Sequence, residues 1–217
     1  MAEKHPAGAD ADYLRWHTLD HRPEQQRLPA IRASLRAVST PACRRARAAC
    51  DASLTAVDHV MTYFFTGLAG LEAFSDLSIA LRNAGRSPFI LPPVQRGVYT
   101  VASRNAAPRV RVGADVLPWL PIRGVYMLLE QGRPAPAPST EVPGIAGVWC
   151  ADSVPTQYSS TGESHRLSLC FLDGDPVDTA ARLRPVLEAR WNDGGMHPLL
   201  AAPFYSIVPF EWNRYLP

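Results

Sequence analysis

Apolar and polar positions along the first 104 residues predict a helix, two strands, a second helix and a third strand, in that order. The strand-like stretches are 31–37, 57–67 and 92–103. The first alternates apolar with polar residues, which is typical of a strand with one buried face, and the second is rich in β-branched and aromatic residues. Leucine and phenylalanine recur at helical spacing over 68–84, and Gly85 is placed to end that helix.

The opening helix is predicted over residues 10–22. Asp10 or Asp12 is suited to cap its N-terminus, because a short carboxylate can accept hydrogen bonds from the first free amides. Pro23 disfavours the helical conformation of Arg22, so the helix is expected to end there.

The second half of the chain repeats this pattern with changes. Its strand-like stretches are 121–131, 142–153, 165–174 and 203–212. A helix is predicted from Pro176, with Asp175 as its N-cap, and Pro185 inside that helix should kink or split it. Residues 132–141 take the place of the opening helix, and their three prolines exclude a packed helix.

These patterns predict an α+β fold of two tandem ferredoxin-like units, each with one element missing. The first unit, 1–104, lacks an obvious opening strand, because its first residues are few and polar. The second unit, 121–217, lacks its first helix. Residues 105–120 are predicted as a linker, and the Arg-Val-Arg-Val stretch at 109–112 is a candidate for the missing edge strand.

Composition and charge exclude several classes of partner. The chain has 217 residues, of which 47% are apolar, so it can bury a substantial core. A net charge of +2 gives no reason to expect nucleic acid, and no apolar run is long enough to span a membrane. The first residues lack the order of a signal peptide, and the four cysteines match no zinc spacing. A cytoplasmic protein without a bound metal is expected.

The candidate chemistry lies on one side of the opening helix. At 100° per residue, one broad arc holds Tyr13, Trp16, His17, Asp20 and His21, and arginines occupy the opposite side. The arginines should face water, so the arc with both imidazoles should face the sheet. A plain core helix would carry aliphatic residues there, which makes this arc a candidate for acid–base chemistry.

Three interpretations of the arc remain open. In the first, His21 or His17 is a general base, and Asp20 or Glu24 orients its ring. In the second, His17, His21 and Glu24 bind a metal, which Pro23 disfavours because it should take Glu24 off the helix. In the third, the polar side chains only form hydrogen bonds and salt bridges at the helix end, the commonest role of such groups.

Residues 12–74 resemble the dimeric α/β-barrel superfamily, and in particular its EthD-like branch. That branch has an acidic, aromatic and histidine-bearing first helix, followed by a lead into the second strand. The matching positions here are Trp16, Asp20, His21, Pro23, Glu24, Leu28 and Pro29. Ala30 stands where glycine is usual. The motif is more specific for the fold than for any reaction.

The resemblance implies a barrel and a class of chemistry. Two ferredoxin-like sheets of this superfamily usually close a barrel across a dimer, so a degenerate tandem chain would close it within one molecule, as a monomer or a homodimer of tandem units. It also implies a small-molecule enzyme without an organic cofactor, of the isomerase, cyclase or cofactor-independent monooxygenase type. The substrate would be apolar, aromatic or polyketide-like, and the reaction proton transfer or cofactor-free oxygenation.

The residues assigned to such a site all come from the first half. We expect His21 to be the base, His17 the second polar contact and Asp20 the orienting group. The expected substrate-binding residues are Trp16, Tyr13, Tyr63 and Phe65. The alternative is a non-catalytic barrel protein that binds a hydrophobic ligand or serves only as a structural subunit.

Overall fold

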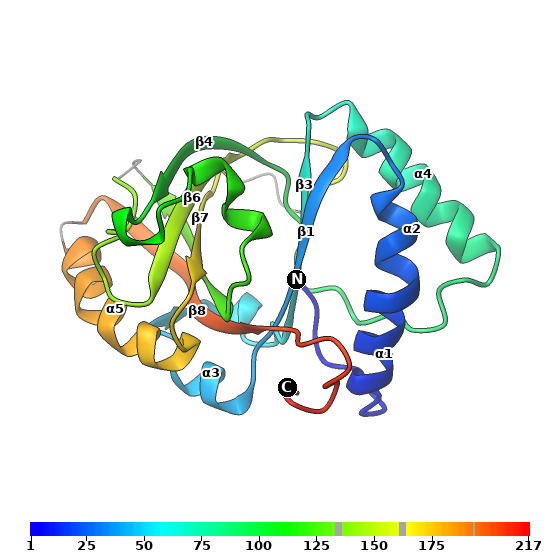
Figure 1. Cartoon of the computed structure of the whole chain (residues 1–217), viewed down its shortest axis with the longest axis horizontal. Coiled ribbons are helices and arrows are strands. Elements are labelled where there is room, and N and C mark those ends of the chain that lie inside the picture. Colours follow the sequence, from blue (N-terminus) through cyan, green and yellow to red (C-terminus); the bar gives the residue numbers. More distant parts are fainter. Residues whose placement is uncertain (133–135, 161–163, 193) are drawn as a thin grey trace.

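The computed structural model describes residues 1–132, 136–160, 164–192 and 194–217, and its centre is one antiparallel sheet curled into a partial barrel (Figure 1). The strands are β1 (Ile31–Val38), β2 (Ala49–Cys50), β3 (His59–Phe65), β4 (Tyr99–Ala106), β5 (Gly124–Gly132), β6 (Ile145–Ser153), β7 (Arg166–Leu172) and β8 (Met196–Ser206). Their spatial order is β3-β1-β8-β5-β7-β6-β4, and β2 pairs with β8.

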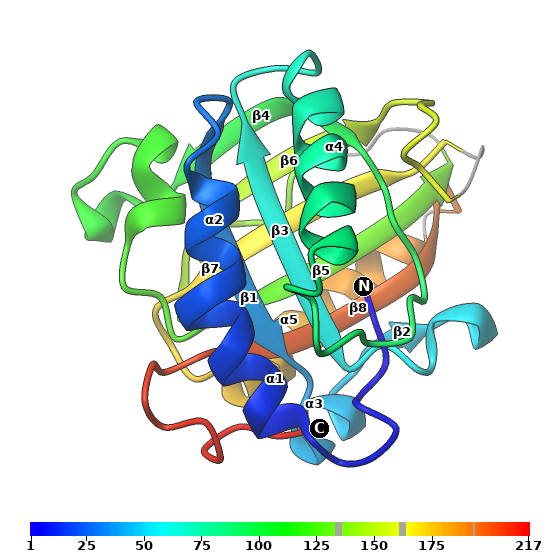
Figure 2. The ribbon, with the colours of Figure 1, turned by 90° about the vertical axis from the view of Figure 1, so that its right-hand side faces the viewer.

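Helices cover the outer face of the sheet. They are α1 (Asp10–Trp16), the π-helical turn η1 (His17–His21), α2 (Arg22–Gln26), α3 (Pro41–Arg45), α4 (Gly70–Asn83) and α5 (Pro176–Asn192). The short 3-10 helices are η2 (Ala52–Leu54), η3 (Pro108–Val110) and η4 (Ala114–Trp119). Figure 2 shows α1, α2 and α4 lying across β1 and β3, and Figure 1 shows α5 over the other part of the sheet.

The inside of the curled sheet is a packed apolar core. Its large buried side chains include Leu117, Trp149, Phe171 and Phe204. Leu117 comes from η4, which closes one end of the barrel because Gly147 leaves room for it: a Cβ on Gly147 would lie 2.4 Å from a Leu117 methyl. The barrel interior is therefore filled by side chains.

The strands of the first half extend both edges of the second-half sheet. On one side β1 pairs with β8 through Ala37 and Val38. On the other side β4 pairs with β6, from Tyr99 opposite Ser153 to Ala106 opposite Gly147. The two predicted units thus share one continuous sheet, and their boundaries at 104 and 121 remain a prediction.

The predicted linker contains no edge strand. Within residues 105–120, β4 ends at Ala106 and η3 and η4 follow, so the expectation of a strand at 109–112 is wrong. Ala2 instead forms bridges to His59 of β3 and to Pro93. Backbone bonds from Ala2 to His59 (2.9 Å) and from Glu3 to Pro92 (2.9 Å) hold this segment between β3 and the chain before β4.

Local signals place α5 and the end of α4 correctly. The Asp175 carboxylate accepts from the amides of Val177 (2.9 Å) and Asp178 (3.2 Å), as the predicted N-cap should. Gly85 has φ +69° and follows α4, as predicted. Pro185 does not split α5, which runs unbroken from Pro176 to Asn192.

Several predicted boundaries differ from the structure. The strand expected over 92–103 is β4, which begins only at Tyr99 and ends at Ala106. The strand expected over 203–212 is β8, which begins earlier and ends at Ser206. The helix expected to end before Pro23 continues to Gln26, so we call residues 10–26 the opening helix. Arg22 keeps helical φ and ψ of −63° and −44°, and its amide bonds the carbonyl of His17 across a widened turn. Such a π turn relieves the clash between a proline ring and the preceding turn.

Neither predicted acidic cap sits at the start of the opening helix. Ala9 occupies the N-cap position, and no side chain caps the helix. Asp10 is instead buried, 6% exposed. Among the described residues no helix has the length and hydrophobicity needed to cross a lipid bilayer.

A buried ion pair holds α5 on the sheet. Glu130 of β5 is 0% exposed and accepts from Arg190 through both oxygens, at 2.9 and 2.8 Å. The indole of Trp191 donates to the same carboxylate at 2.9 Å. Both oxygens of the carboxylate are thus bonded by side chains of α5.

We predict that Arg190→Met destabilises the protein by about 3–5 kcal/mol, because it leaves the Glu130 charge buried without its counter-ion. Denaturant unfolding followed by circular dichroism measures the change. Arg182→Met, an exposed position on the same helix, should alter stability by no more than about 0.5 kcal/mol. A loss below about 1 kcal/mol in Arg190→Met would contradict the importance of this pair.

Candidate active site

Polar side chains of the opening helix meet polar side chains on the outer face of β1 and β3. Leu35 and Ala37 of β1 pack into the barrel core, so Arg36 between them points outward, beneath the helix. We call the group formed there the polar cluster. Its members are Asp10, Tyr13, His17, His21, Gln25, Arg36, His59 and Tyr63.

The arc predicted to face the sheet does so in part, because its aromatic and imidazole side chains turn inward and Asp20 does not. His17 is 4% exposed and Tyr13 is 8% exposed, and both lie against the sheet. Trp16 and His21 are half-buried, and their rings stack with centroids 4.8 Å apart. The rings of His17 and His21 are 5.4 Å apart. The structure therefore brings the two imidazoles together with the indole, as the sequence indicated.

Asp20 does not contact either imidazole through a hydrogen bond. Its carboxylate is partly exposed and accepts from Arg86 at 2.7 Å, and Glu24 bonds the same guanidinium at 2.9 Å. One oxygen of Glu24 is thereby engaged by an arginine. Among the described residues no group of three histidine, cysteine or carboxylate side chains is arranged to hold a metal ion.

Gln25 takes the position expected of the orienting group. Its side-chain amide lies 3.0 Å from Nε2 of His21 and also bonds the hydroxyl of Tyr63. The widened turn in the helix brings Gln25 onto the same face as the two histidines. The ring of Phe65 packs on Phe74 of α4 with centroids 5.5 Å apart, and its centroid is 6.5 Å from that of Tyr63.

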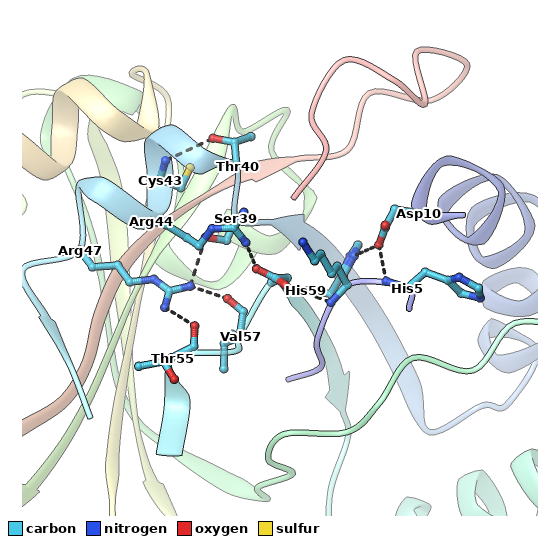
Figure 3. Close-up of polar contacts among 12 residues, drawn as sticks. His5, Asp10, Ser39, Thr40, Cys43, Arg44, Arg47, Thr55, Val57 and His59 are labelled. Carbon is cyan, nitrogen blue, oxygen red and sulfur yellow. Dashed lines mark hydrogen bonds and ion pairs between the residues drawn. The ribbon is translucent and has the colours of Figure 1, made fainter. Parts of the chain in front are cut away.

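A second chain of contacts links the start of the opening helix to β1 and β3. Asp10 accepts from Nε2 of His59 at 2.8 Å and from the amide of His5 at 2.8 Å (Figure 3). Nδ1 of His59 then faces the Arg36 guanidinium at 3.5 Å. Arg36 also lies over the ring of Tyr13, 4.4 Å from its centroid.

Many buried polar atoms around the cluster have no hydrogen-bond partner among the described residues. They are Trp16 Nε1, His17 Nδ1, Thr18 Oγ1, His21 Nδ1, Arg22 Nε, Glu24 Oε2 and Arg36 Nε. Native proteins leave few buried polar groups unsatisfied, and such groups concentrate at functional sites. Both imidazoles thus keep a ring nitrogen that no described residue occupies.

Burial and the Arg36 charge keep the imidazoles neutral. Burial holds the pKa of His17 well below its ordinary value, and the charge of Arg36 lowers that pKa further. Burial also lowers the pKa of His21, against the opposing effect of Asp20. Burial lowers the pKa of His59 although Asp10 favours its charged form. Neutral imidazoles at pH 7 can accept protons.

Two surface pockets lie elsewhere in the described part of the chain. The smaller, about 300 Å³, is lined by β4 and η4 residues such as Arg104 and Asp115. The larger, about 410 Å³, lies at one mouth of the barrel beside Gln95 and His197. Neither is lined by a residue of the opening helix, so the cavity expected beneath it is not one of these pockets.

The architecture is a curled antiparallel sheet of α/β-barrel type with its polar site under the helices outside the barrel. A solved structure described as a crystal structure study of an anthrone oxidase-like protein has a similar fold, with a TM-score of 0.55 and 9% sequence identity. The likeness covers 95% of this chain and 89% of that one. No protein-family model and no curated protein matches the chain. At this identity the likeness shows the fold alone.

We predict that the protein loses stability in acid as its buried histidines titrate. Their folded pKa lies below the unfolded value, so the folded state binds fewer protons, and stability present above the unfolded pKa is lost as pH falls through the folded one. The unfolding free energy should begin to fall below about pH 7.5 and continue to fall until the folded pKa values are passed, by at most about 1.4 kcal/mol per pH unit for each histidine.

Two variants test whether the buried histidines cause this pH dependence of stability. His17→Gln should flatten this pH dependence, whereas His197→Gln, at an exposed position, should leave it unchanged. Urea unfolding at several pH values measures both. An equally steep dependence in His17→Gln would show that its imidazole is not the group that titrates.

Proposed function

We propose that the protein is an enzyme without an organic cofactor that removes a proton from a small apolar substrate at the polar cluster. The observation that carries this proposal is the pair of neutral imidazoles, each with an unoccupied Nδ1, beside the indole of Trp16. A cofactor-independent isomerase, cyclase or monooxygenase needs such a base and a flat apolar wall for its substrate.

His21 is the proton acceptor in this proposal. A glutamine amide can turn either its oxygen or its NH2 group toward an imidazole. In the structure the NH2 group of Gln25 lies toward Nε2 of His21, and the Gln25 oxygen accepts from the Tyr63 hydroxyl. Rotating the amide by 180° places its oxygen toward Nε2, so that the ring proton resides there and Nδ1 is left as the acceptor. Tyr63 then accepts from the NH2 group. Gln25 and Tyr63 then orient the base in the role expected of Asp20, and His17 is the second polar contact.

The proton would come from a carbon acidified by a neighbouring carbonyl. The C–H bond breaks, the proton moves to Nδ1 of His21, and the electron pair delocalises onto the carbonyl oxygen as an enolate. Return of the proton to another carbon gives isomerisation. An electron-rich aromatic enolate can instead react directly with dioxygen, and a CH2 group then becomes a carbonyl with release of water. The fold shared with an anthrone oxidase-like protein favours the second outcome.

The order of the strands supports the finer assignment to a degenerate tandem of ferredoxin-like units. In the second half β8, β5, β7 and β6 are consecutive neighbours, and α5 joins β7 to β8. In the first half Ala2 occupies part of the place of the absent strand. We propose on these grounds a self-closed relative of the EthD-like branch that acts in the cytoplasm, as a monomer or as a homodimer of tandem units.

A non-catalytic barrel protein is the second candidate, and one observation favours it. The two pockets of the described residues lie away from the opening helix. On this alternative the polar cluster only attaches the helix to the sheet, as Asp10 and His59 do.

Anthrone is the substrate that tests the proposal, because dioxygen uptake and quinone absorbance both report its conversion. His21→Ala should lower turnover by at least about 100-fold, the usual contribution of a general base. Because His21 is only half-buried, the unfolding free energy should change by no more than about 1 kcal/mol.

His197→Ala, at an exposed histidine in the other half of the chain, is the matched control and should keep full turnover. A His21→Ala protein that turns over anthrone at the wild-type rate would refute the assignment of the base. A large loss of stability in that variant, with no turnover by the wild type, would establish the structural alternative.

A further inference from the structure

Arg36 is a buried cation whose charge the described residues leave uncompensated by a direct salt bridge. It is 6% exposed, and its contacts are Nδ1 of His59 at 3.5 Å and the face of the Tyr13 ring. Its Nε is buried and has no hydrogen-bond partner in the described part of the chain. Asp10 is connected to it only through the His59 ring.

Two other arginines of this protein that are largely removed from water have an anionic partner. Arg190, on the opposite part of the sheet, is met by both oxygens of Glu130. Arg166 bonds Asp152 at 3.0 Å. A guanidinium taken out of water is retained when an anion or several acceptors satisfy its N–H groups. The unoccupied Nε of Arg36 therefore indicates a place for an acceptor that the described chain does not supply.

The surroundings of Arg36 define the shape of the missing acceptor. The Tyr13 ring lies against the guanidinium, and further aromatic rings continue from it: Tyr13 and Trp16 are 6.1 Å apart, and Trp16 and Phe89 are 6.0 Å apart. His17 Nδ1 and His21 Nδ1 add two unoccupied polar positions on the same helix face. A planar molecule with an apolar body and one oxyanion matches this combination of groups.

We propose that Arg36 binds the oxyanion of a flat aromatic or conjugated ligand, as carboxylate, phenolate or enolate, at the base of the polar cluster. The proposal rests on the proposed function only for the location of the site. What it specifies beyond that function is the charge of the ligand. The site selects a molecule that carries, or acquires on deprotonation, one negative oxygen. Arg36 would stabilise that oxygen through charge-assisted hydrogen bonds.

The segment 207–217 covers one side of this site and must move to admit the ligand. Ile207, Trp212 and Leu216 pack on Tyr13 and its apolar neighbours, and the segment contains no regular helix or strand. Figure 2 shows it passing below the start of α1. Few backbone hydrogen bonds hold it in place, so it can be displaced more easily than the helices packed on the sheet.

The test compares 2-naphthoate with 2-naphthamide, which share a ring system and differ in charge. Binding to the full chain is measured by quenching of tryptophan fluorescence and by calorimetry at constant ionic strength. Wild-type protein should bind naphthoate at least about tenfold more tightly than the amide, the size expected of a charge-assisted contact. Equal affinities, or no binding of naphthoate, would overturn the proposal.

Substitutions in β1 test whether Arg36 is responsible for the preference for naphthoate over naphthamide. Arg36→Met should abolish it, and Arg32→Met, an exposed arginine on the same strand, should preserve it. Arg36→Lys should still prefer naphthoate but bind it several-fold more weakly, because an ammonium lacks the planar fork. If Arg36→Met does not fold, Arg36→Lys decides: unchanged naphthoate affinity in the lysine variant overturns the proposal.

The outcome of this binding test does not depend on whether the protein converts anthrone. An Arg36-dependent preference for naphthoate in a protein that does not convert anthrone would sustain the oxyanion site and refute the proposed function. Turnover of anthrone that depends on His21, without any preference for naphthoate, would sustain the function and refute the oxyanion site.

Discussion

The position of one charged side chain, Arg36 on the outer face of β1, constrains how the opening helix packs on the sheet. Removing a guanidinium from water costs several kcal/mol unless its donors and its charge are satisfied. The helix therefore presents the π face of Tyr13, and β3 presents His59. Burial keeps the pKa of His17 well below its ordinary value and the same charge lowers it further, so the position of this imidazole over the sheet accounts for its neutral form.

The π turn makes the helix face compatible with this packing. Over eight residues a regular α-helix drifts by about 80°, so His17 and Gln25 would diverge across the surface. A wider turn takes up more residues in one revolution and reduces that drift. His17, His21 and Gln25 therefore share the buried side, and Gln25 reaches Tyr63. Pro23, which in the sequence predicts the end of the helix, coincides with the turn that produces this alignment.

Several predictions that depended only on neighbouring residues succeeded, although the helix end predicted at Pro23 did not, and those that depended on distant partners failed. Asp175 caps α5 because the donors are two and three residues away. The inward face of the opening helix follows from its own arginines. Asp10, in contrast, resembles a cap in the sequence, but its partner His59 is 49 residues away. No pattern in the sequence identified Gln25 as a site residue, because its partner Tyr63 is 38 residues away in the chain.

The buried charge under α5 is paired with a counter-ion, whereas the buried charge under the opening helix has no direct salt bridge among the described residues. This contrast indicates where a functional site lies. Under α5 the core is mostly apolar, and the buried carboxylate of Glu130 is matched by the fork of Arg190 and the indole of Trp191. Because every oxygen of the Glu130 carboxylate is hydrogen-bonded, the incomplete hydrogen bonding of Arg36 within the described chain has no structural explanation of its own. Since Leu117 and the large rings fill the barrel interior, the helix-covered face is where an unmet hydrogen-bonding demand and aromatic surface coincide. Stability alone would favour an apolar residue at the position of Arg36. The presence of this arginine is therefore better explained by a ligand that it binds.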